Sequence, residues 1–403
     1  MTDIDDNLRV DALESMPLLR PDLAQIAAEV GLRRIDMVAW RDLEDPEAGG
    51  SEVHAAMVAE RWAAAGLDIR IRTSAARDLP SSVHRDGYRV VRKGGRHTVF
   101  PRVALRALAP GAPPDGLVEI WNGMPFFSPV WSATPRVVFL HHVHDEMWPM
   151  TLHPRPLAWL GRMIELRLAP PMYRRSHVVT LSASSRNEIV GVLGLPAENV
   201  TVVAPGVDRR FRPGGTRSRV PMVVAVGRLA PVKRFPLLID ALVELRRRHP
   251  DLQAVIAGDG KERPALLAQV RARQAENWLR LPGRVSDVEL VRLYRQAWIV
   301  ASASVREGWG MTLTEAAACG TPAVATRIAG HTDAVVHGRS GLLVNRATEL
   351  TQAMDDVLAN PALRGRLSAG AVAEASGYDW DRTAHGTLAA LVRATRKPRW
   401  TGG

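Results

Sequence analysis

The sequence predicts two consecutive α/β domains, each organised around a parallel sheet. A chain of 403 residues is too long for one ordinary core and comfortable for two. Short apolar segments alternate with helical patterns in both halves, which is typical of βαβ units. A polar, basic stretch rich in glycine and proline, residues 206–219, has the composition of a linker. We therefore expect domains over residues 1–212 and 213–383.

Each predicted strand of the first half is a short apolar run. Residues 34–40 begin the series, and a helical pattern over residues 52–66 follows a glycine-containing loop. A serine-rich helix start at residues 182–185 follows a later strand. The remaining strands are expected at residues 67–72, 117–121, 136–141, 177–181 and 200–204.

The second half repeats this alternation. Ligands of open parallel sheets bind beyond the carboxyl ends of the strands, so the loops there are where we expect the chemistry. The strands are expected at residues 221–226, 252–257, 298–301 and 322–326, and the helices at residues 234–249, 287–296 and 312–319.

The chain is strongly basic, with a formal net charge of +11. A basic surface suits nucleic acid, an anionic membrane or phosphorylated substrates. No zinc-finger spacing and no aromatic RNA-binding signature is present, so we expect no nucleic-acid partner. Nearly all positive side chains are arginines, and the lysines are Lys93, Lys233, Lys261 and Lys397.

Several features indicate a cytoplasmic protein. The acidic start of the sequence lacks the apolar run of a secretory signal. No stretch approaches the ~20 apolar residues of a membrane helix. Cys319 is the single cysteine, which excludes an intramolecular disulfide and a cysteine-based zinc cluster.

A glycine-punctuated loop leads into a helix within residues 306–315. Unpaired N–H groups at a helix start, together with the helix dipole, form an anion site that suits a diphosphate. Glu307 precedes this helix and Glu315 lies about one turn inside it, so they are expected to contact two parts of one ligand. The pattern also fits an ordinary capped helix. The expected donors are the N–H groups of Gly310, Met311, Thr312 and Leu313.

Two cations mark another strand-to-helix corner. Arg228 follows the strand at residues 221–226, and Lys233 opens the next helix. Two positive charges beside a helix start suit a diphosphate leaving group. A surface arginine and lysine in a turn is the plainer alternative.

A third loop, residues 45–52, contains Gly49 and Gly50 before a serine at a helix start. Such a loop lets the backbone approach a phosphate closely, although a plain helix cap would look the same.

Together these residues resemble glycosyltransferase family 4. The resemblance covers nearly the whole second half and implies a GT-B fold, in which two Rossmann-like domains face each other across a cleft. It also implies that a helix over about residues 384–403 crosses back to complete the first domain. The matching elements are Gly227-Arg228 with Lys233, Glu307 with Glu315, Gly320-Thr321-Pro322, Ala329-Gly330, residues 341–344, residues 205–208 and Trp380-Asp381.

The resemblance also implies residue roles. Arg228 and Lys233 would bind the donor diphosphate, with Gly50 in the loop that closes over it. Glu307 would contact the transferred sugar and Glu315 the ribose. The loop at residues 282–287, which includes Arg284 and Val285, resembles the family's loop that packs on the nucleotide base.

A histidine after the strand at residues 136–141 resembles the family's active-site histidine facing the sugar. His141 is preferred because it directly follows the apolar run, while His142 and His144 remain alternatives. Three close histidines also suggest a metal site, but a fourth ligand is missing and neighbouring strand residues point to opposite sides. We expect no metal.

Two Asp-x-Asp patterns also occur. The one at Asp3 and Asp5 lies in the terminal segment, and the one at Asp379 and Asp381 fits a helix cap. Neither follows an apolar strand, so neither is expected to bind a metal–diphosphate.

The expected activity is retaining, metal-independent transfer of a hexose of mannose or glucose type. The donor would be a GDP- or UDP-linked sugar, with no further cofactor. The acceptor would be a lipid, a polysaccharide or a small molecule. A nucleotide-sugar epimerase and a sugar phosphorylase of the same fold are the alternatives. A dehydrogenase is disfavoured because no Gly-x-Gly-x-x-Gly follows the first strand.

Two basic stretches of the first half lie at residues 92–106 and 154–175. The second combines arginines with leucine, tryptophan and methionine and resembles an interfacial helix. It would allow peripheral contact with the inner face of the membrane. A helix packed on its own sheet is the alternative, because Pro170-Pro171 interrupts the run.

Overall fold

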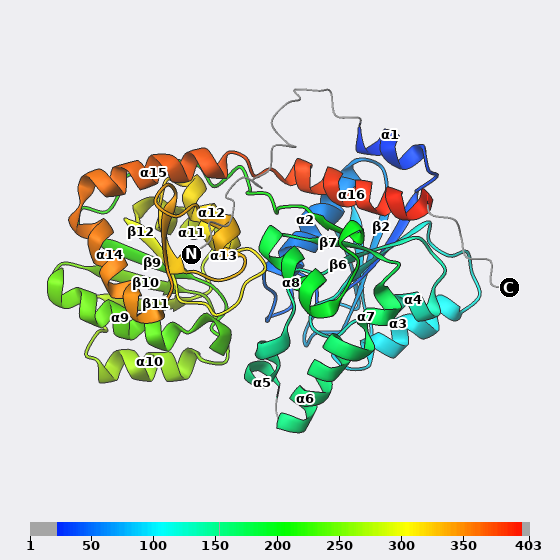
Figure 1. The fold of residues 1–403 in the computed structure, drawn as a ribbon, viewed down its shortest axis with the longest axis horizontal. Helices are drawn as coiled ribbons and strands as arrows, with labels where there is room; N and C mark the ends of the chain where they lie inside the picture. The colour runs from blue at the N-terminus through cyan, green and yellow to red at the C-terminus, as the bar shows by residue number, and fades with distance from the viewer. Residues whose placement is uncertain (1–21, 153, 397–403) are drawn as a thin grey trace, which may run out of the picture.

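The computed structural model describes residues 22–152 and 154–396, which form two α/β domains side by side (Figure 1). The Asp3/Asp5 pattern and residues 397–403 of the predicted last helix lie outside the described residues.

The described part of the first domain has an eight-stranded sheet. Its neighbouring strands are parallel, apart from one antiparallel pair at an edge. In sheet order the strands are β3 (Ser82–Arg85), β4 (Tyr88–Arg92), β2 (Asp68–Thr73), β1 (Arg34–Val38), β5 (Gly116–Ile120), β6 (Arg136–Phe139), β7 (His177–Thr180) and β8 (Val200–Val202).

Helices surround this sheet (Figure 1). The α-helices are α1 (Leu23–Ala28), α2 (Gly50–Ala64), α3 (Val99–Leu108), α4 (Ser128–Trp131), α5 (Trp148–Thr151), α6 (Arg155–Met163), α7 (Pro170–Tyr173) and α8 (Ala183–Leu193). Shorter turns are η1 (Asp145–Met147), the π-helical η2 (Ile164–Leu168) and η3 (Ala197–Asn199).

The second domain has a six-stranded parallel sheet among the described residues. In sheet order its strands are β11 (Leu279–Gly283), β10 (Gln253–Ala257), β9 (Met222–Val226), β12 (Ile299–Ser302), β13 (Ala323–Thr326) and β14 (Gly341–Val344). Its helices are η4 (Pro231–Lys233), α9 (Phe235–Arg248), α10 (Arg263–Ala272), α11 (Asp287–Gln296), α12 (Met311–Ala318), α13 (His331–Ala334), η5 (Ala347–Glu349), α14 (Leu350–Ala359) and α15 (Pro361–Ala375).

The last helix, α16 (Trp380–Arg396), returns to the first domain and packs on α2 and its sheet (Figure 1). Leu388 and Leu391 are fully buried there, and the Trp62 indole donates to the Ala384 carbonyl at 3.0 Å. The chain therefore crosses between the domains twice. The two crossing segments pack closely, because a Cβ at Gly206 in the first would lie 2.2 Å from the backbone nitrogen of Trp380 in the second.

No helix among the described residues is long and apolar enough to cross a bilayer.

Candidate active site

Both sheets have a point at which the strand order reverses. In the second domain β9 lies between β10 and β12, so the loops after β9 and β12 diverge and leave room for a ligand. Arg228 follows β9, and Glu307 follows β12. The order of strands thus brings these two predicted residues to the same edge of the sheet.

Lys233 and Glu307 are in direct contact at this edge. Lys233 ends the short η4 turn, and its ammonium group forms an ion pair with the Glu307 carboxylate. The Ser304 hydroxyl donates to the same carboxylate at 2.8 Å. Burial alone would raise the pKa of Glu307, but Lys233, His331 and Ser304 together outweigh it and hold the pKa at about 2. Glu307 is therefore ionised at neutral pH.

The start of α12 lies beside this pair. Gly310 is the N-cap residue, with a φ of 115° that glycine adopts readily. No protein acceptor is recorded among the described residues for the N–H groups of Gly310, Met311 and Thr312. The prediction that the Leu313 N–H is unpaired was wrong, because it donates to the Gly310 carbonyl at 2.9 Å. The first turn tightens in this way at many helix starts.

Glu315 lies further along α12 and differs from Glu307 in its surroundings. It accepts a hydrogen bond from the Tyr294 hydroxyl at 3.1 Å. Burial raises its pKa to about 7, since this hydrogen bond only partly compensates. One loop and helix thus carry one carboxylate that is strongly acidic and another that is half-protonated near neutral pH.

The loop after β11 contains the predicted base-binding residues. Val285 packs against the core beneath α11 and α12. Arg284 is exposed and donates to the Pro46 carbonyl of the first domain at 2.5 Å.

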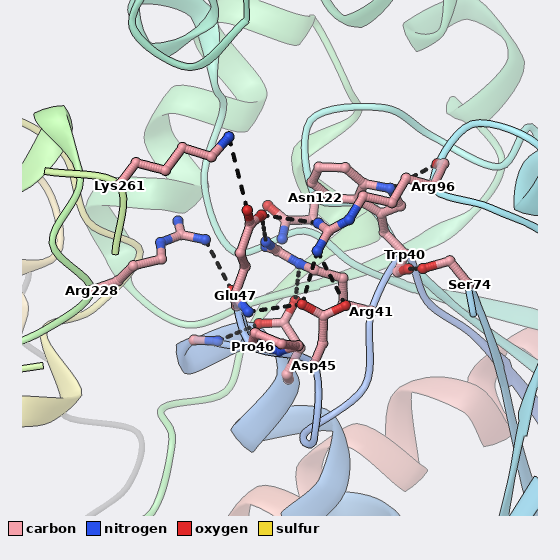
Figure 2. Close-up of polar contacts among 12 residues, drawn as sticks. Trp40, Arg41, Asp45, Pro46, Glu47, Ser74, Arg96, Asn122, Arg228 and Lys261 are labelled. Atoms are coloured by element: carbon pink, nitrogen blue, oxygen red, sulfur yellow. Dashed lines mark hydrogen bonds and ion pairs between the residues drawn. The ribbon is translucent and has the colours of Figure 1, made fainter. Parts of the chain in front are cut away.

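The loop after β1 reaches across to the second domain (Figure 2). Arg228 donates to the Glu47 carbonyl at 3.1 Å, and Lys261 lies 3.9 Å from the Glu47 carboxylate. On its own domain the same carboxylate contacts Arg41 at 3.4 Å and Arg96 at 2.9 Å. Glu47 is therefore surrounded by positive charge from both domains.

Two glycines allow the domains to approach closely. A Cβ at Gly50, the first residue of α2, would lie 3.3 Å from the Met311 sulfur. A Cβ at Gly308 would lie 2.8 Å from the His141 carbonyl oxygen. The predicted glycine loop and the predicted anion site therefore face each other directly.

His141 occupies a buried position behind this interface. Its Nε2 lies 3.2 Å from the Nδ1 of His54, a fully buried residue of α2. Burial lowers the pKa of His141 well below its ordinary value. We preferred His141 because it directly follows the apolar run. As a continuation of that buried strand, its ring points into the domain interior, toward His54.

His142 and His144 are the histidines nearer the donor residues. Their rings stack with centroids 4.8 Å apart. Burial lowers the pKa of His142 to about 4, and the charges next in effect are those of Glu307, Arg306 and Lys233. His142 is thus a neutral imidazole that shares its surroundings with the Lys233–Glu307 pair.

Sequence reasoning missed two residues, one buried against the start of α12 and one at the contact between the domains. His331 is 1% exposed and packs against Gly310. Its Nδ1 donates to the Thr326 carbonyl at 2.8 Å, and its Nε2 lies 3.4 Å from the Ser302 hydroxyl. The Asp333 carboxylate accepts from the Ala183 N–H at 2.9 Å, at the start of α8 in the other domain. The predicted Ala329-Gly330 element directly precedes His331 and lies three residues before Asp333, and it was the available signal.

Among residues 22–152 and 154–396, no group of three or more His, Cys, Asp or Glu side chains is placed to hold a metal ion. The Asp381 carboxylate pairs with Arg61 at 2.8 Å, and the Asp379 side chain accepts from the Asp381 N–H at 3.0 Å. This Asp-x-Asp pattern therefore serves the start of α16.

Two α/β domains with largely parallel sheets that meet at their strand ends define the GT-B fold. Two family models match the chain in succession. The one described as "Glycosyltransferase Family 4" matches residues 48–211, and "Glycosyl transferases group 1" matches residues 207–373. The chain belongs to glycosyltransferase family 4.

Two similar curated proteins are both named "D-inositol 3-phosphate glycosyltransferase". The protein from Nocardioides sp. is 29% identical over 425 aligned positions, which cover 91% of either chain. The protein from Frankia alni is 35% identical over 234 positions, which cover 53% of this chain and 58% of that relative.

Solved structures share the fold at low sequence identity. Sucrose-phosphate synthase from Thermosynechococcus elongatus superposes with a TM-score of 0.76 at 18% identity, over 90% of this chain and 98% of that chain. The Anabaena protein Alr3699/HepE, in complex with UDP and glucose, gives a TM-score of 0.69 at 20% identity, over 89% of this chain and 99% of that chain.

Proposed function

We propose that this chain is a retaining, metal-independent hexosyltransferase that uses a nucleotide-diphosphate sugar. The observation that carries the proposal is the Lys233–Glu307 pair, which lies next to Arg228 and the start of α12. Positive and negative groups are thus placed side by side where a sugar diphosphate would span them. The proposed donor is UDP- or GDP-linked, and UDP is to be tested first because solved structures of this fold carry it.

The reaction breaks the bond between the anomeric carbon and the diphosphate. Negative charge grows on the leaving diphosphate, and Arg228, Lys233 and the N–H groups of Gly310 to Thr312 would stabilise it without a metal. Positive charge grows on the sugar, beside the ionised Glu307 carboxylate. Lys233 therefore exchanges part of its contact with Glu307 for the diphosphate when the donor binds.

The neutral His142 suits the sugar side of the site. A neutral imidazole can donate or accept a hydrogen bond without repelling the growing positive charge on the sugar. We propose His142, with His144 stacked on it, for the role that resemblance assigns to a histidine at this strand end. Glu315 would bind the ribose, and Arg284 with Val285 would lie against the base.

The acceptor would bind on the first domain. The name of the relatives points to a phosphorylated cyclitol as the first small-molecule acceptor to test. Arg41 and Arg96 lie on this face, but both are paired with Glu47, so an anionic acceptor would have to displace that carboxylate. Lipid and polysaccharide acceptors form the other test classes. None of the relatives and structures reported above is an epimerase or a phosphorylase.

The test combines binding with turnover. A ligand that binds the folded state raises the melting temperature by mass action, so UDP, GDP, ADP and their hexose conjugates are compared with EDTA present. The preferred donor is then incubated with each acceptor class, and NMR reads the anomeric configuration of the product. A shift with one nucleotide family and a product of retained configuration are expected. No shift with any nucleotide, or a requirement for a divalent metal, would contradict the proposal.

A further inference from the structure

Most of the exposed large apolar side chains in the described chain lie on one set of helices, α3 to α7 of the first domain. We call this surface the helical rim. Trp159 is the largest of these side chains and is 63% exposed. The apolar residues of the helical rim are Leu105, Leu108, Val130, Met150, Leu157, Trp159, Leu160, Met163, Leu168 and Met172.

The helices of the rim are spatial neighbours. α3 contacts α4, α4 contacts α7, α7 contacts η2, and η2 continues into α6, which contacts α5. Figure 1 shows them along the lower edge of the first domain, with α5 and α6 extending furthest from the sheet. The helices that carry the exposed apolar side chains therefore form one contiguous set along this edge of the first domain.

The packing of α6 explains why its large side chains remain outside. The helix uses its small residues, Ala158 and Gly161, to contact the protein. A Cβ at Gly161 would lie 2.5 Å from the Trp148 ring, which is itself fixed by an indole hydrogen bond of 2.8 Å to the buried Glu165. The large side chains of α6 consequently face away, namely Leu157, Trp159, Leu160 and Met163. The alternative of a helix packed on its own sheet holds for the later part of the stretch, where Ala169 and Tyr173 join the core against Val138.

Positive charge accompanies these apolar residues. Between the start of α3 and the end of α7, the exposed carboxylates among the described residues are Glu146 and Asp115, and Asp115 already accepts from the N–H groups of Arg33 and Arg34. Asp145 is paired with Arg162 at 2.6 Å, and no ion pair is recorded in the described chain for Arg155, Arg167, Arg174 or Arg175. The exposed arginines of the rim are Arg102, Arg106, Arg155, Arg162, Arg167, Arg174 and Arg175.

We propose that the helical rim binds the surface of an anionic lipid bilayer. The apolar side chains would enter the boundary between headgroups and acyl chains, and the arginines would contact lipid phosphates. A second copy of the rim is a poorer partner, because its arginines would meet like charge. α5 also contacts the η4 turn that carries Lys233, so the bound surface adjoins the donor side of the enzyme. The proposal does not depend on the donor or acceptor proposed above.

The experiment is flotation of the full chain with vesicles. Binding is expected to vesicles that contain phosphatidylglycerol, to weaken with added salt, and to be much weaker to phosphatidylcholine alone. Combining Trp159→Ser with Leu160→Ser should reduce the partition coefficient at least tenfold, since roughly two apolar side chains leave the interface. Each of Arg155→Gln and Arg167→Gln should reduce it about fivefold.

Matched controls lie on the second domain. Val288 is 81% exposed, and Arg219 and Arg366 are exposed arginines. Val288→Ser and the double change of Arg219→Gln with Arg366→Gln should leave flotation unchanged. All rim variants change exposed side chains, so their melting temperatures and their transfer to a soluble acceptor should match the parent chain.

Three results would overturn the proposal. The first is no flotation with anionic vesicles, and the second is equal loss of binding in the control variants. The third is a dimer in light scattering that the Trp159 variant dissociates, which would assign the rim to a second copy of the chain. An enzyme that floats but fails to transfer sugar would contradict the proposed function and leave the membrane inference supported.

Discussion

The two faces that meet between the domains handle charge in different ways. On the second domain, within the described part of the chain, Lys233 pairs with one carboxylate and Arg228 has one hydrogen-bond partner, a backbone carbonyl of the opposite loop. On the first domain, the loop after β1 interleaves arginines and carboxylates in a dense network. That network pairs Arg41, Arg85, Arg92 and Arg96 with Asp42, Glu44, Asp45, Glu47 and Glu52.

This difference indicates that the positive side chains of the two domains have different roles. A cation with few protein partners can give its charge to a ligand at little cost. A cation within a network must first leave another charge unpaired, and that penalty rises with burial. The second domain is thus equipped to hold an anion, and the first domain uses its arginines to fix the shape of a loop.

The largest test of this comparison is Lys233→Ala against Arg96→Ala. Loss of Lys233 should lower kcat about a hundred- to thousandfold, because one preorganised positive charge on the leaving group is removed. Loss of Arg96 should cost less than about tenfold, since its charge serves the loop. Steady-state kinetics and melting curves of both variants check this. Equal losses would mean that both faces contribute charge to the ligand.

The second test concerns the contact between the faces. Gly308→Ala places a Cβ against the His141 carbonyl, and both groups are backbone-anchored, so the domains must separate slightly. Such a shift of the donor site relative to the first domain should lower kcat/KM about ten- to hundredfold. Gly365→Ala is the control, because no atom lies within 4 Å of a Cβ there. If both variants behave like the parent chain, close approach at Gly308 is unimportant for turnover.

The two carboxylates around α12 should respond to pH in opposite directions. The pKa of Glu307 falls from 4.5 to about 2 on folding, so its stabilising contribution is complete above pH 4.5 and is lost as the pH falls toward 2. The pKa of Glu315 rises from 4.5 to about 7, so stability is greatest below pH 4.5 and declines as the pH rises through 7.

Urea unfolding of Glu315→Gln and the parent chain across this pH range measures the effect. The variant should lose the decline between about pH 4.5 and 7, which we expect to be on the order of 1–3 kcal/mol in the free energy of unfolding. Glu307→Gln serves as the comparison and should keep that decline while losing the acid-side dependence. Identical profiles for all three proteins would contradict the pKa assignments.

The smallest expected effect belongs to Glu47→Gln. This change keeps the side-chain shape and removes the charge that Arg41, Arg96 and Lys261 surround. KM for an anionic acceptor should fall about two- to fivefold, because the arginines are released, while KM for an uncharged acceptor should not. Kinetics with one acceptor of either kind distinguish these outcomes. An equal change for both acceptors would show that Glu47 acts through loop shape.

Much of the second domain could be predicted from sequence, because its chemistry lies in short motifs next to strong strand patterns. Arg228 and Glu307 follow the adjacent strands β9 and β12, as parallel alternation requires, and Lys233 ends the short turn after β9. The first domain gave weaker signals. The β3–β4 pair was not predicted, although its Asp86-Gly87 turn, with both φ values positive, is a typical hairpin sequence.

Other features depended on side-chain direction, which a motif does not contain. Three nearby histidines each fit a strand end, and only the packing of His141 against His54 shows that its ring turns inward. Likewise, the amphipathic sequence of α6 fits both a helix at a membrane surface and a helix packed on its own sheet. The Trp148 ring against Gly161 decides which face remains outside.

The return of α16 to the first domain sets an order for folding on the ribosome. The first domain is synthesised first, yet Trp62 and its neighbours lack the covering helix until residues 380–396 emerge. At ~5–20 residues per second this interval lasts on the order of ten seconds or more, because the whole second domain is synthesised before α16. We therefore expect the nascent first domain to expose apolar surface throughout that interval and to be the half that a ribosome-associated chaperone engages.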